Sequence, residues 1–593
     1  MTLVQRPPLT MTGRSRTVSP VLLAVLVAAV LHLLWWQFLA TSGGDIAAQD
    51  AWAEFARSHP DSAYNLAWYG GMHPVSYSVV SPYIMAQLGV RATMILAGTI
   101  SAGLLAWLVV GRREERGRWL PALYGAVALA GNALSGRVTF ALGTLFALAA
   151  LCVVFAWPRP TRSTTERWLR GLLAVVTSAL ATAASPVAGA FLGLVAATLW
   201  LRKRRPAAYA LGVPPVLVVA ASALLFPFSG RQPMAWYSAI LPIAMGVAVV
   251  ILTPQRWRTV QAGGALYIVA VLAAWLVPSP VGTNVSRLGL LFGGVVLVAA
   301  ITLGAWRTSL VGRRYGVRAA QVVLAMALIT STIWQVAYAV RDVVSSAPPE
   351  SFSSDIGPLL YQLRARQADH ARVEVVPTKS HREAAAIAPH VPLARGWNRQ
   401  ADAERNPVFY RDRDLDAHSY RRWLHRWAVG YVVLATTAKP DPAAAAEAEL
   451  VAGGLPYLDQ VWADDEWTLY QVRRATPLVS PPATVVAYDA AELTISTPRA
   501  GRIVVRIADS PWLSLVDANG DPIPNATDTN TWYALGGATD PACLSGLDAD
   551  LTDEGAGGPR DDWLVLHAPA PGTYRIAAPY KLPRGTSCPT RED

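Results

Sequence analysis

The acidic residues best suited to chemistry lie in a polar segment, residues 41–90, which interrupts a strongly apolar part of the sequence. Asp45 follows two glycines, and the residues after it have helical spacing. Asp45 and Gln49 would share one face of that helix, and Asp50 and Glu54 another. A carboxylate at this position could accept the proton of a hydroxyl group during group transfer. Asp45 is the first candidate for such a base, and Asp50 is the second.

The leaving group of such a transfer would need partners as well. If the leaving group is an anion such as a phosphate, it requires cationic groups, hydrogen-bond donors or a divalent ion. Side chains in the polar segment and at the ends of apolar segments could bind the substrates: Trp68, Tyr69, His73, Tyr77, Arg137, Arg231 and Arg287, together with Gln49 and Glu54. The sequence leaves the need for a divalent cation open.

Several of these residues also have a plainer structural interpretation. Asp45 could cap the helix that follows it, because Asp is favoured at the N-cap and an acidic group suits the first turn. Trp68 and Tyr69 could anchor the chain at a membrane interface. His73 precedes a proline and could face lipid headgroups. These alternatives stay open at the level of sequence.

Long apolar segments fill the first 340 residues and must position these side chains. The chain has 593 residues, of which 53% are hydrophobic and 15% charged, whereas a soluble chain carries about 25% charged residues. A helix needs about 20 residues to cross the hydrocarbon layer. The candidate segments, some of them short, are 20–40, 92–110, 120–134, 138–157, 172–184, 187–201, 207–226, 236–252, 260–277, 288–306 and 319–340. We therefore predict a polytopic α-helical membrane domain over residues 20–340 with about 11 spans.

The basic residues predict the orientation of these spans. Arginines cluster in alternate loops: every loop expected inside has at least two basic residues, and each outside loop after the first has at most one. This bias follows the positive-inside rule. It predicts a multi-pass plasma-membrane protein with a cytoplasmic tail, residues 1–19, and an extracytoplasmic carboxy-terminal region. The net charge of +11 is therefore interpreted as a topology signal, and no nucleic-acid partner is expected. A cleaved signal peptide is less favoured, because more spans follow the first.

Beyond residue 340 the apolar runs become short and alternate with polar residues. Residues 341–480 have the pattern of a small α/β domain, with helices at 356–370, 420–429 and 443–452 and strands at 373–376 and 431–435. From about Trp467 strands follow one another, at 467–472, 492–496, 503–507, 531–534, 563–567 and 574–577. Residues 481–593 are therefore predicted to form a β-sandwich-like domain.

Two further groups of residues stand out in this carboxy-terminal region. A dense group could stack on a sugar and hydrogen-bond to it, or could pack the region against the membrane domain: Arg395, Trp397, Arg399 and Gln400. Cys543 and Cys588 both lie where oxidation is permitted if the region is extracytoplasmic. The sequence does not decide whether these two cysteines form a disulfide bond.

The helical membrane domain, the acidic residue at the start of the first outside loop and the extracytoplasmic carboxy-terminal region together resemble the GT-C superfamily of polyprenyl-phosphate-sugar-dependent glycosyltransferases. The resemblance implies that Asp45 is the catalytic base, that the donor is a lipid-linked sugar and that the acceptor is a cell-envelope polysaccharide or glycolipid. This chain has Asp45 and Asp50 in place of the adjacent acidic pair of many members. The carboxy-terminal region is also similar to that of YfhO-like multi-pass proteins and their actinobacterial relatives, in stretches 394–400, 406–407, 430–434 and 467–472.

Two other functions stay open. A transporter of the major-facilitator kind has twelve spans, and the basic stretch 111–118 resembles one of its loops, but acidic residues are almost absent from the apolar segments, whereas coupled transporters keep ionisable groups at mid-membrane. A non-catalytic envelope-assembly protein would use the sandwich to bind polysaccharide or a partner. In every case membrane lipid surrounds the first half of the chain.

Overall fold

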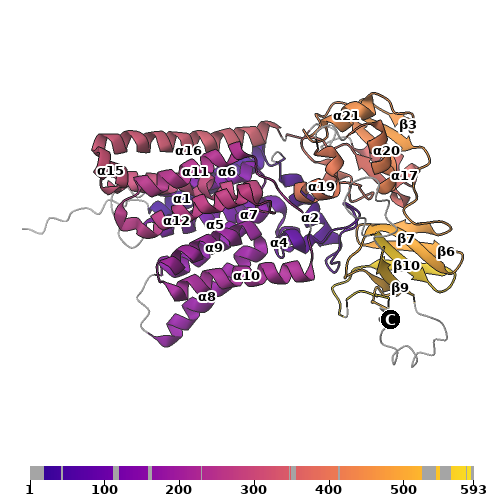
Figure 1. Ribbon diagram of the computed structural model, residues 1–593, viewed down its shortest axis with the longest axis horizontal. Helices are drawn as coiled ribbons and strands as arrows, with labels where there is room; N and C mark the ends of the chain where they lie inside the picture. The colour runs from indigo at the N-terminus through magenta and orange to yellow at the C-terminus, as the bar shows by residue number, and fades with distance from the viewer. Residues whose placement is uncertain are drawn as a thin grey trace, which may run out of the picture.

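The chain folds into a helical half and a sheet-containing half that lie end to end, as the computed structural model shows (Figure 1). Between them lie the short helices of the polar segment 41–90. The structure describes residues 19–41, 44–110, 119–157, 163–228, 230–345, 347–348, 356–411, 415–523, 542–547, 563–582 and 584–588.

Each of the apolar segments predicted to span the membrane contains a helix. The helices are α1 (Pro20–Phe38), α5 (Val90–Val110), α6 (Trp119–Leu134), α7 (Val138–Phe155), α8 (Thr164–Ala184), α9 (Pro186–Leu201), α10 (Arg205–Leu225), α11 (Trp236–Leu252), α12 (Arg258–Leu276), the run from α13 (Ser286–Leu288) to α14 (Gly294–Thr302), and α16 (Val317–Ser345). Within the described residues, 7 helices are long and apolar enough to cross a membrane, and α6, α9 and α11 are shorter apolar helices. The chain is a multi-pass membrane protein, while the count of 11 spans and their orientation stay predictions.

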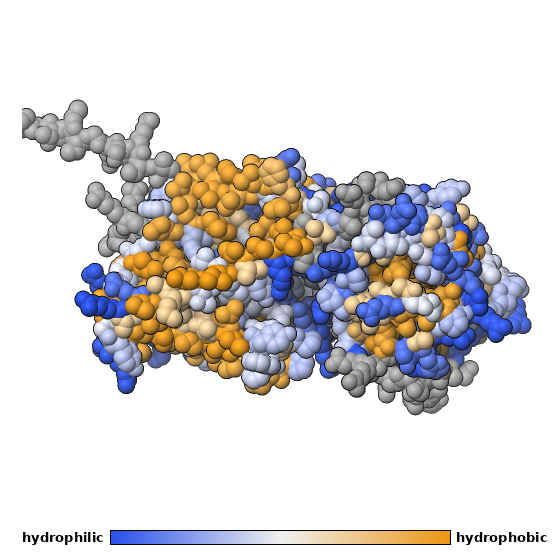
Figure 2. Space-filling model, turned by 90° about the horizontal axis from the view of Figure 1, so that it is seen from above, coloured by the Kyte–Doolittle hydropathy of each residue, from blue (hydrophilic) through white to orange (hydrophobic). Residues whose placement is uncertain are grey.

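The helical half turns its large apolar side chains outward. On α1, Leu22, Leu26 and Val30 are exposed, whereas Ala24 and Ala28 are fully buried against neighbouring helices. Small residues allow helices to approach closely within a bilayer, and exposed leucines suit contact with lipid. Figure 2 shows the resulting apolar surface over the helical half, with hydrophilic residues at its outer end and at the junction with the second half.

The polar segment forms the joint between the two halves. It contains α2 (Ile46–Ser58), α3 (Pro74–Tyr77) and α4 (Ser81–Leu88). Ile46 and Ala53 of α2 pack with residues of the helical half. Ala51 and Trp52 of the same helix pack with the core of the second half. The helix predicted after Asp45 is present, and it is buried between the two halves.

A mixed four-stranded sheet forms the first unit after the membrane domain, with strand order β1-β2-β4-β3. Its strands are β1 (Arg372–Val375), β2 (Val429–Ala435), β3 (Leu458–Ala463) and β4 (Trp467–Val472); its helices include α17 (Gly357–Ala365), α18 (Glu383–Ala386), α19 (Arg399–Arg405), α20 (Ala417–Arg426) and α21 (Ala445–Ala452). Only β1 and β2 are parallel. The alternating pattern that begins at β4 continues into the sandwich strands, although the predicted boundary at residue 480 leaves β4 in the α/β domain. In the structure β4 pairs with β2 and β3, which alternation cannot show because it reveals a strand but not its partner.

Two antiparallel sheets form the last unit, with strand orders β7-β10-β9 and β5-β6-β11-β8. The strands are β5 (Thr484–Tyr488), β6 (Glu492–Thr497), β7 (Gly501–Ala508), β8 (Ser514–Val516), β9 (Cys543–Gly546), β10 (Trp563–Ala568) and β11 (Gly572–Ala577). Ile495, Val505 and Leu566 share the core between the sheets. Cys543 and Cys588 are joined by a disulfide bond. The strand predicted at 531–534 lies outside the described residues.

Candidate active site

Asp45 lies at the start of α2, where the joint meets the ends of the membrane helices. Its side chain makes no capping hydrogen bond to α2, so the structure does not support a helix cap as its role. Its backbone N–H donates to the carbonyl of Ser135 at 3.2 Å, which fixes it beside the turn between α6 and α7. The side chain is 30% exposed. The carboxylate is therefore held at the boundary of the membrane domain with its oxygens available.

Two arginines from different helices approach this carboxylate. Arg137 Nε lies 3.6 Å and Arg287 Nη2 lies 3.8 Å from Asp45 Oδ2. These distances allow ion pairing but exceed hydrogen-bond length. The guanidinium groups are only 16% and 15% exposed, and among the described atoms Arg137 Nε has no hydrogen-bond partner. Buried guanidinium donors that are not filled by a carboxylate are suited to bind a phosphate.

A second carboxylate completes this cluster. Arg137 Nη2 lies 3.6 Å from Asp342 Oδ2, and Ser135 Oγ donates to the same oxygen at 2.5 Å. Asp342 lies near the end of α16 and was not among the residues selected from the sequence. The sequence does contain a sign of its importance: Asp342 is the one acidic residue in the apolar helix Val317–Ser345. Ionisable groups in such helices often have a function.

Gln49 and Tyr77 lie beside Asp45. Gln49 is fully buried. Its amide lies beside the Tyr77 hydroxyl, and within the described part of the chain neither amide atom has a hydrogen bond of good geometry. Burial raises the pKa of the Tyr77 phenol, and the charge of Asp45 raises it further, while Arg287 opposes both effects. Both residues were predicted from the sequence, and the structure groups them with Asp45, Arg137 and Arg287. An unpaired buried amide is costly, which makes Gln49 a candidate for binding a polar ligand.

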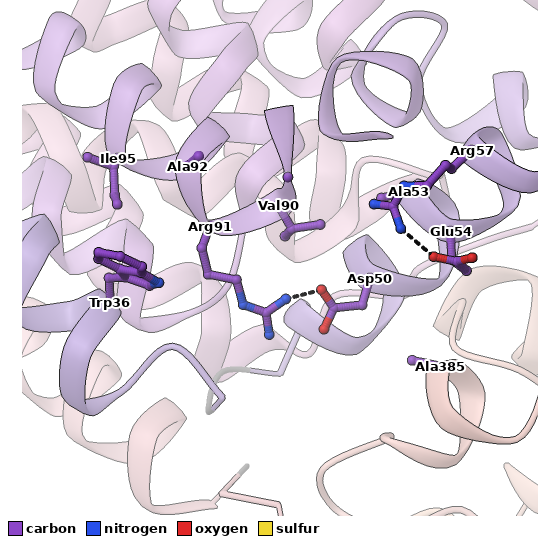
Figure 3. A pocket seen from close by; sticks show the side chains of 11 residues that line it. Trp36, Asp50, Ala53, Glu54, Arg57, Val90, Arg91, Ala92, Ile95 and Ala385 are labelled. Atoms are coloured by element: carbon purple, nitrogen blue, oxygen red, sulfur yellow. Dashed lines mark hydrogen bonds and ion pairs between the residues drawn. The ribbon is translucent and has the colours of Figure 1, made fainter. Parts of the chain in front are cut away.

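Asp50 has a different role, although it lies on the same helix. It accepts hydrogen bonds from Arg91 of α5 and, at 2.7 Å, from Arg382 of the α/β unit. Both of its oxygens are occupied by these hydrogen bonds, whereas the arginines near Asp45 stay beyond hydrogen-bond length. The structure therefore does not support Asp50 as a reserve base. Asp50 lines a pocket of about 670 Å³ between α1, α2 and α5. Figure 3 shows its contact with Arg91 and the separate pair that Glu54 makes with Arg57 at 2.6 Å.

The aromatic residues and the histidine of the joint are buried and structural. Trp68 Nε1 donates to the carbonyl of Ala384 at 3.1 Å, and the Tyr69 hydroxyl donates to that of Gly396 at 2.7 Å. His73 contacts Ser510 of the sandwich at 3.1 Å through Nε2. Burial lowers the pKa of His73 to about 4. These side chains fasten the second half to the joint, and neither a headgroup contact nor a substrate groove is supported for them.

The polar group Arg395, Trp397, Arg399 and Gln400 does not act as one site. Part of it stabilises the core of the α/β unit, and part of it contacts the membrane half. Arg395 is buried and paired with Glu374 at 2.9 Å and with Glu447, so it belongs to the core of the unit. Arg399 lies 5.8 Å from the Tyr410 ring. Trp397 Nε1 donates to the carbonyl of Gly44 at 2.6 Å, next to Asp45.

Arg231 lies in the loop between α10 and α11, and Gln400 lies beside that loop. Gln400 Nε2 donates at 3.0 Å to Gln232 of that loop. These contacts of Trp397 and Gln400 favour packing against the membrane domain over an open sugar site. Arg231 is exposed, and no described contact joins it to Asp45.

A site that binds a phosphate often holds a divalent ion. Among the described residues, no group of three or more His, Cys, Asp and Glu side chains is placed to hold one. Asp45 and Asp342 are bridged by Arg137, and an arginine between two carboxylates does not fit a shared cation. The side chains around Asp45 therefore do not make a metal site.

Comparisons with known proteins give a family model and distant structural neighbours. A domain of unknown function, DUF8823, matches residues 480–593. Among curated proteins, none matches the chain. The archaeal oligosaccharyltransferase AglB from Archaeoglobus fulgidus, in complex with an inhibitory peptide and a dolichol-phosphate, is similar with a TM-score of 0.45 and 10% identity over 70% of this chain and 69% of that one.

ArnT from Cupriavidus metallidurans, in the apo state, is similar with a TM-score of 0.42 and 15% identity over 76% of this chain and 97% of that one. The Archaeoglobus fulgidus oligosaccharyltransferase tethered to an acceptor peptide has a TM-score of 0.42 and 11% identity over 94% and 88% of the two chains. Likeness at this level carries no conclusion about activity.

Proposed function

We propose that this chain is a membrane glycosyltransferase of the GT-C type. It moves a sugar from a polyprenyl-phosphate donor to a hydroxyl group of a cell-envelope glycan or glycolipid, on the extracytoplasmic face of the plasma membrane. One observation carries the proposal: Asp45 makes no capping bond and lies between two largely buried arginines that ion-pair with it without hydrogen-bonding to it. A base and a phosphate-binding pair thus meet at one point.

The proposed step uses each of these groups once. The acceptor hydroxyl oxygen bonds to the anomeric carbon while the bond from that carbon to the phosphate oxygen breaks. The polyprenyl phosphate leaves with the bonding electrons, and Arg137 and Arg287 stabilise its negative charge. Asp45 accepts the proton of the hydroxyl group. The amide of Gln49, which is fully buried beside Tyr77, is placed to hydrogen-bond to the sugar or the phosphate.

The position of the cluster supports a lipid-borne donor. Arg137 precedes α7, Arg287 lies at the start of the span Gly282–Thr302, and Asp342 lies near the end of α16. All are at the ends of apolar helices, where the phosphate of a lipid lies when its tail is in the hydrocarbon layer. Coupled transport would instead favour ionisable groups at mid-membrane.

Transfer by the purified full chain tests the proposal. Polyprenyl-phosphate pentose and hexose donors are incubated with an envelope-glycan acceptor, and the transferred sugar is measured. We expect Asp45→Asn to lower transfer by about 100- to 10,000-fold, the usual contribution of a general base, without lowering the folded yield. Asp61→Asn is the matched control, because Asp61 is an exposed carboxylate of the same segment. Full activity in Asp45→Asn would remove Asp45 from the mechanism, and uptake into sealed vesicles without a transfer product would support a transporter.

A further inference from the structure

A second pocket lies where the end of α16 meets the α/β unit. Its volume is about 610 Å³. The wall on the α16 side includes Val340, Arg341 and Val344, and the facing wall includes Lys379 and Lys439. This pocket is distinct in its lining from the Asp45 cluster, and the proposed transfer reaction does not use it.

The charged side chains that line this pocket are all positive. The backbone N–H of Lys379 donates to the carbonyl of Lys439 at 2.9 Å, which holds the two lysines side by side. The chain has only four lysines, at positions 203, 379, 439 and 581, so two of the four meet here. Arg341 adds a third cation. None of the described lining residues is acidic, and neighbouring cations repel one another unless an anion lies between them.

Acidic groups beside this pocket already have partners, and one of them, Glu383, accepts a hydrogen bond at 2.7 Å from the hydroxyl of the lining residue Thr378. Asp342 Oδ1 lies 3.2 Å from Arg341, but its other oxygen accepts a hydrogen bond from Ser135 and faces Arg137. Asp441 lies 3.4 Å from His381. Glu466 accepts a hydrogen bond from the Thr437 hydroxyl at 2.5 Å. Arg341 is thus already paired with Asp342, and an anion from outside the described chain would relieve the repulsion between the two lysines beside it.

The helix that forms one wall of the pocket has an exposed apolar face. Ile333, Val336, Val340 and Val344 are all more than half exposed, Val344 at 75%. Their spacing of three and four residues places them on one face of α16. The face runs from the apolar body of the helix to the pocket, so an acyl chain lying along it would have its polar head at the three cations.

We propose that this pocket binds the phosphate headgroup of an anionic phospholipid of the bilayer, with an acyl chain along the exposed face of α16. The lysines belong to the α/β unit and Arg341 to the last span. The bound lipid therefore fixes the α/β unit to the membrane domain beside Asp342.

Binding of phosphatidylglycerol to the full chain tests this proposal. The purified chain in neutral detergent is titrated with the lipid, and the retained lipid is counted by native mass spectrometry. Basic side chains contribute roughly fivefold each to affinity for anionic lipid. We therefore expect the double variant Lys379→Gln/Lys439→Gln to bind about 30-fold more weakly. Lys203→Gln/Lys581→Gln removes the same charge elsewhere and is expected to bind normally.

The remaining variants and ligands separate the alternatives. Lys379→Arg/Lys439→Arg keeps the charge and is expected to keep the affinity, which guards against a folding defect. Equal affinity of the two glutamine double variants, or equal binding of phosphatidylcholine, would overturn the proposal. Glycerol phosphate that binds as tightly as phosphatidylglycerol would overturn the lipid assignment in favour of a soluble phosphate. Asp45→Asn is expected to bind the lipid normally, so failure of this test and failure of the transfer test are distinguishable.

Discussion

The Asp45 carboxylate lies 3.6 Å from Nε of Arg137, close enough for ion pairing but too far for a hydrogen bond. Asp45 belongs to the joint, where it precedes α2, and Arg137 belongs to the membrane domain, where it precedes α7. Arg137 Nε is buried and has no hydrogen-bond partner among the described atoms. An anionic ligand between the two residues could therefore accept a hydrogen bond from it.

Replacing either arginine of the cluster should weaken donor binding. In Arg137→Gln and Arg287→Gln a charge-assisted hydrogen bond to phosphate is lost, which costs about 1.5–3 kcal/mol. We expect KM for the polyprenyl-phosphate donor to rise about 10- to 100-fold in each variant. Arg231→Gln removes an exposed arginine that is outside the cluster and should leave KM unchanged; an equal effect in all three variants would point to loss of net charge.

Asp50→Asn should lower stability and preserve the transfer chemistry. The variant leaves Arg91 and Arg382 facing each other without the carboxylate that joins α5 to the α/β unit. Because the pair is partly exposed, we expect a loss of about 1–3 kcal/mol, measured as a lower unfolding temperature. Glu54→Gln breaks the more exposed pair with Arg57 and should change stability little. A loss of turnover in Asp50→Asn as large as that in Asp45→Asn would contradict this division of roles.

His73 should make the joint sensitive to acid. Burial, together with the charges of Arg405 and Arg584, lowers its pKa to about 4, although its hydrogen bond to the Ala63 carbonyl acts in the opposite direction. The unfolded chain takes up a proton below about pH 6.5, whereas the folded chain resists it. Stability should therefore fall as the pH falls from 6.5 towards 4, by roughly 3 kcal/mol. Thermal unfolding across this range should show a smaller fall in His73→Gln, and an unchanged fall would contradict the assignment.

Glu374 should act in the opposite direction. Burial raises the pKa of its carboxyl well above the ordinary value, against the attraction of Arg395, while Glu447 and Asp402 repel its charge. The folded chain keeps this proton at a pH where the unfolded chain has lost it, so stability falls as the pH rises above about 4.5 towards the folded pKa. Glu374→Gln is neutral in both states and should show a smaller decline in unfolding temperature above this pH. A steeper decline would contradict the sign.

The secondary structure of the chain could largely be predicted from its sequence. A membrane helix must satisfy its own backbone and present apolar side chains over its whole length, so each span leaves a long local signal. Strands such as β6 and β11 were visible by alternation, whereas the short β8 and the edge strands β3 and β5 were not. The weaker signals failed because a strand of three residues, or one that is exposed on both faces, has almost no pattern to detect.

The sequence determined that Asp45 begins a helix between two apolar regions, and that arginines lie at the ends of the spans, because these are properties of neighbouring residues. The packing of the helices brings Arg137 and Arg287 close to Asp45, leaves Arg231 away from it, and adds Asp342 to the cluster. The same packing places Asp50, His73 and Arg395 in ion pairs and hydrogen bonds that hold the fold together. Electrostatic and hydrogen-bond interactions act over a few ångströms, so they depend on how the helices pack and rotate, which the order of residues along the chain does not show.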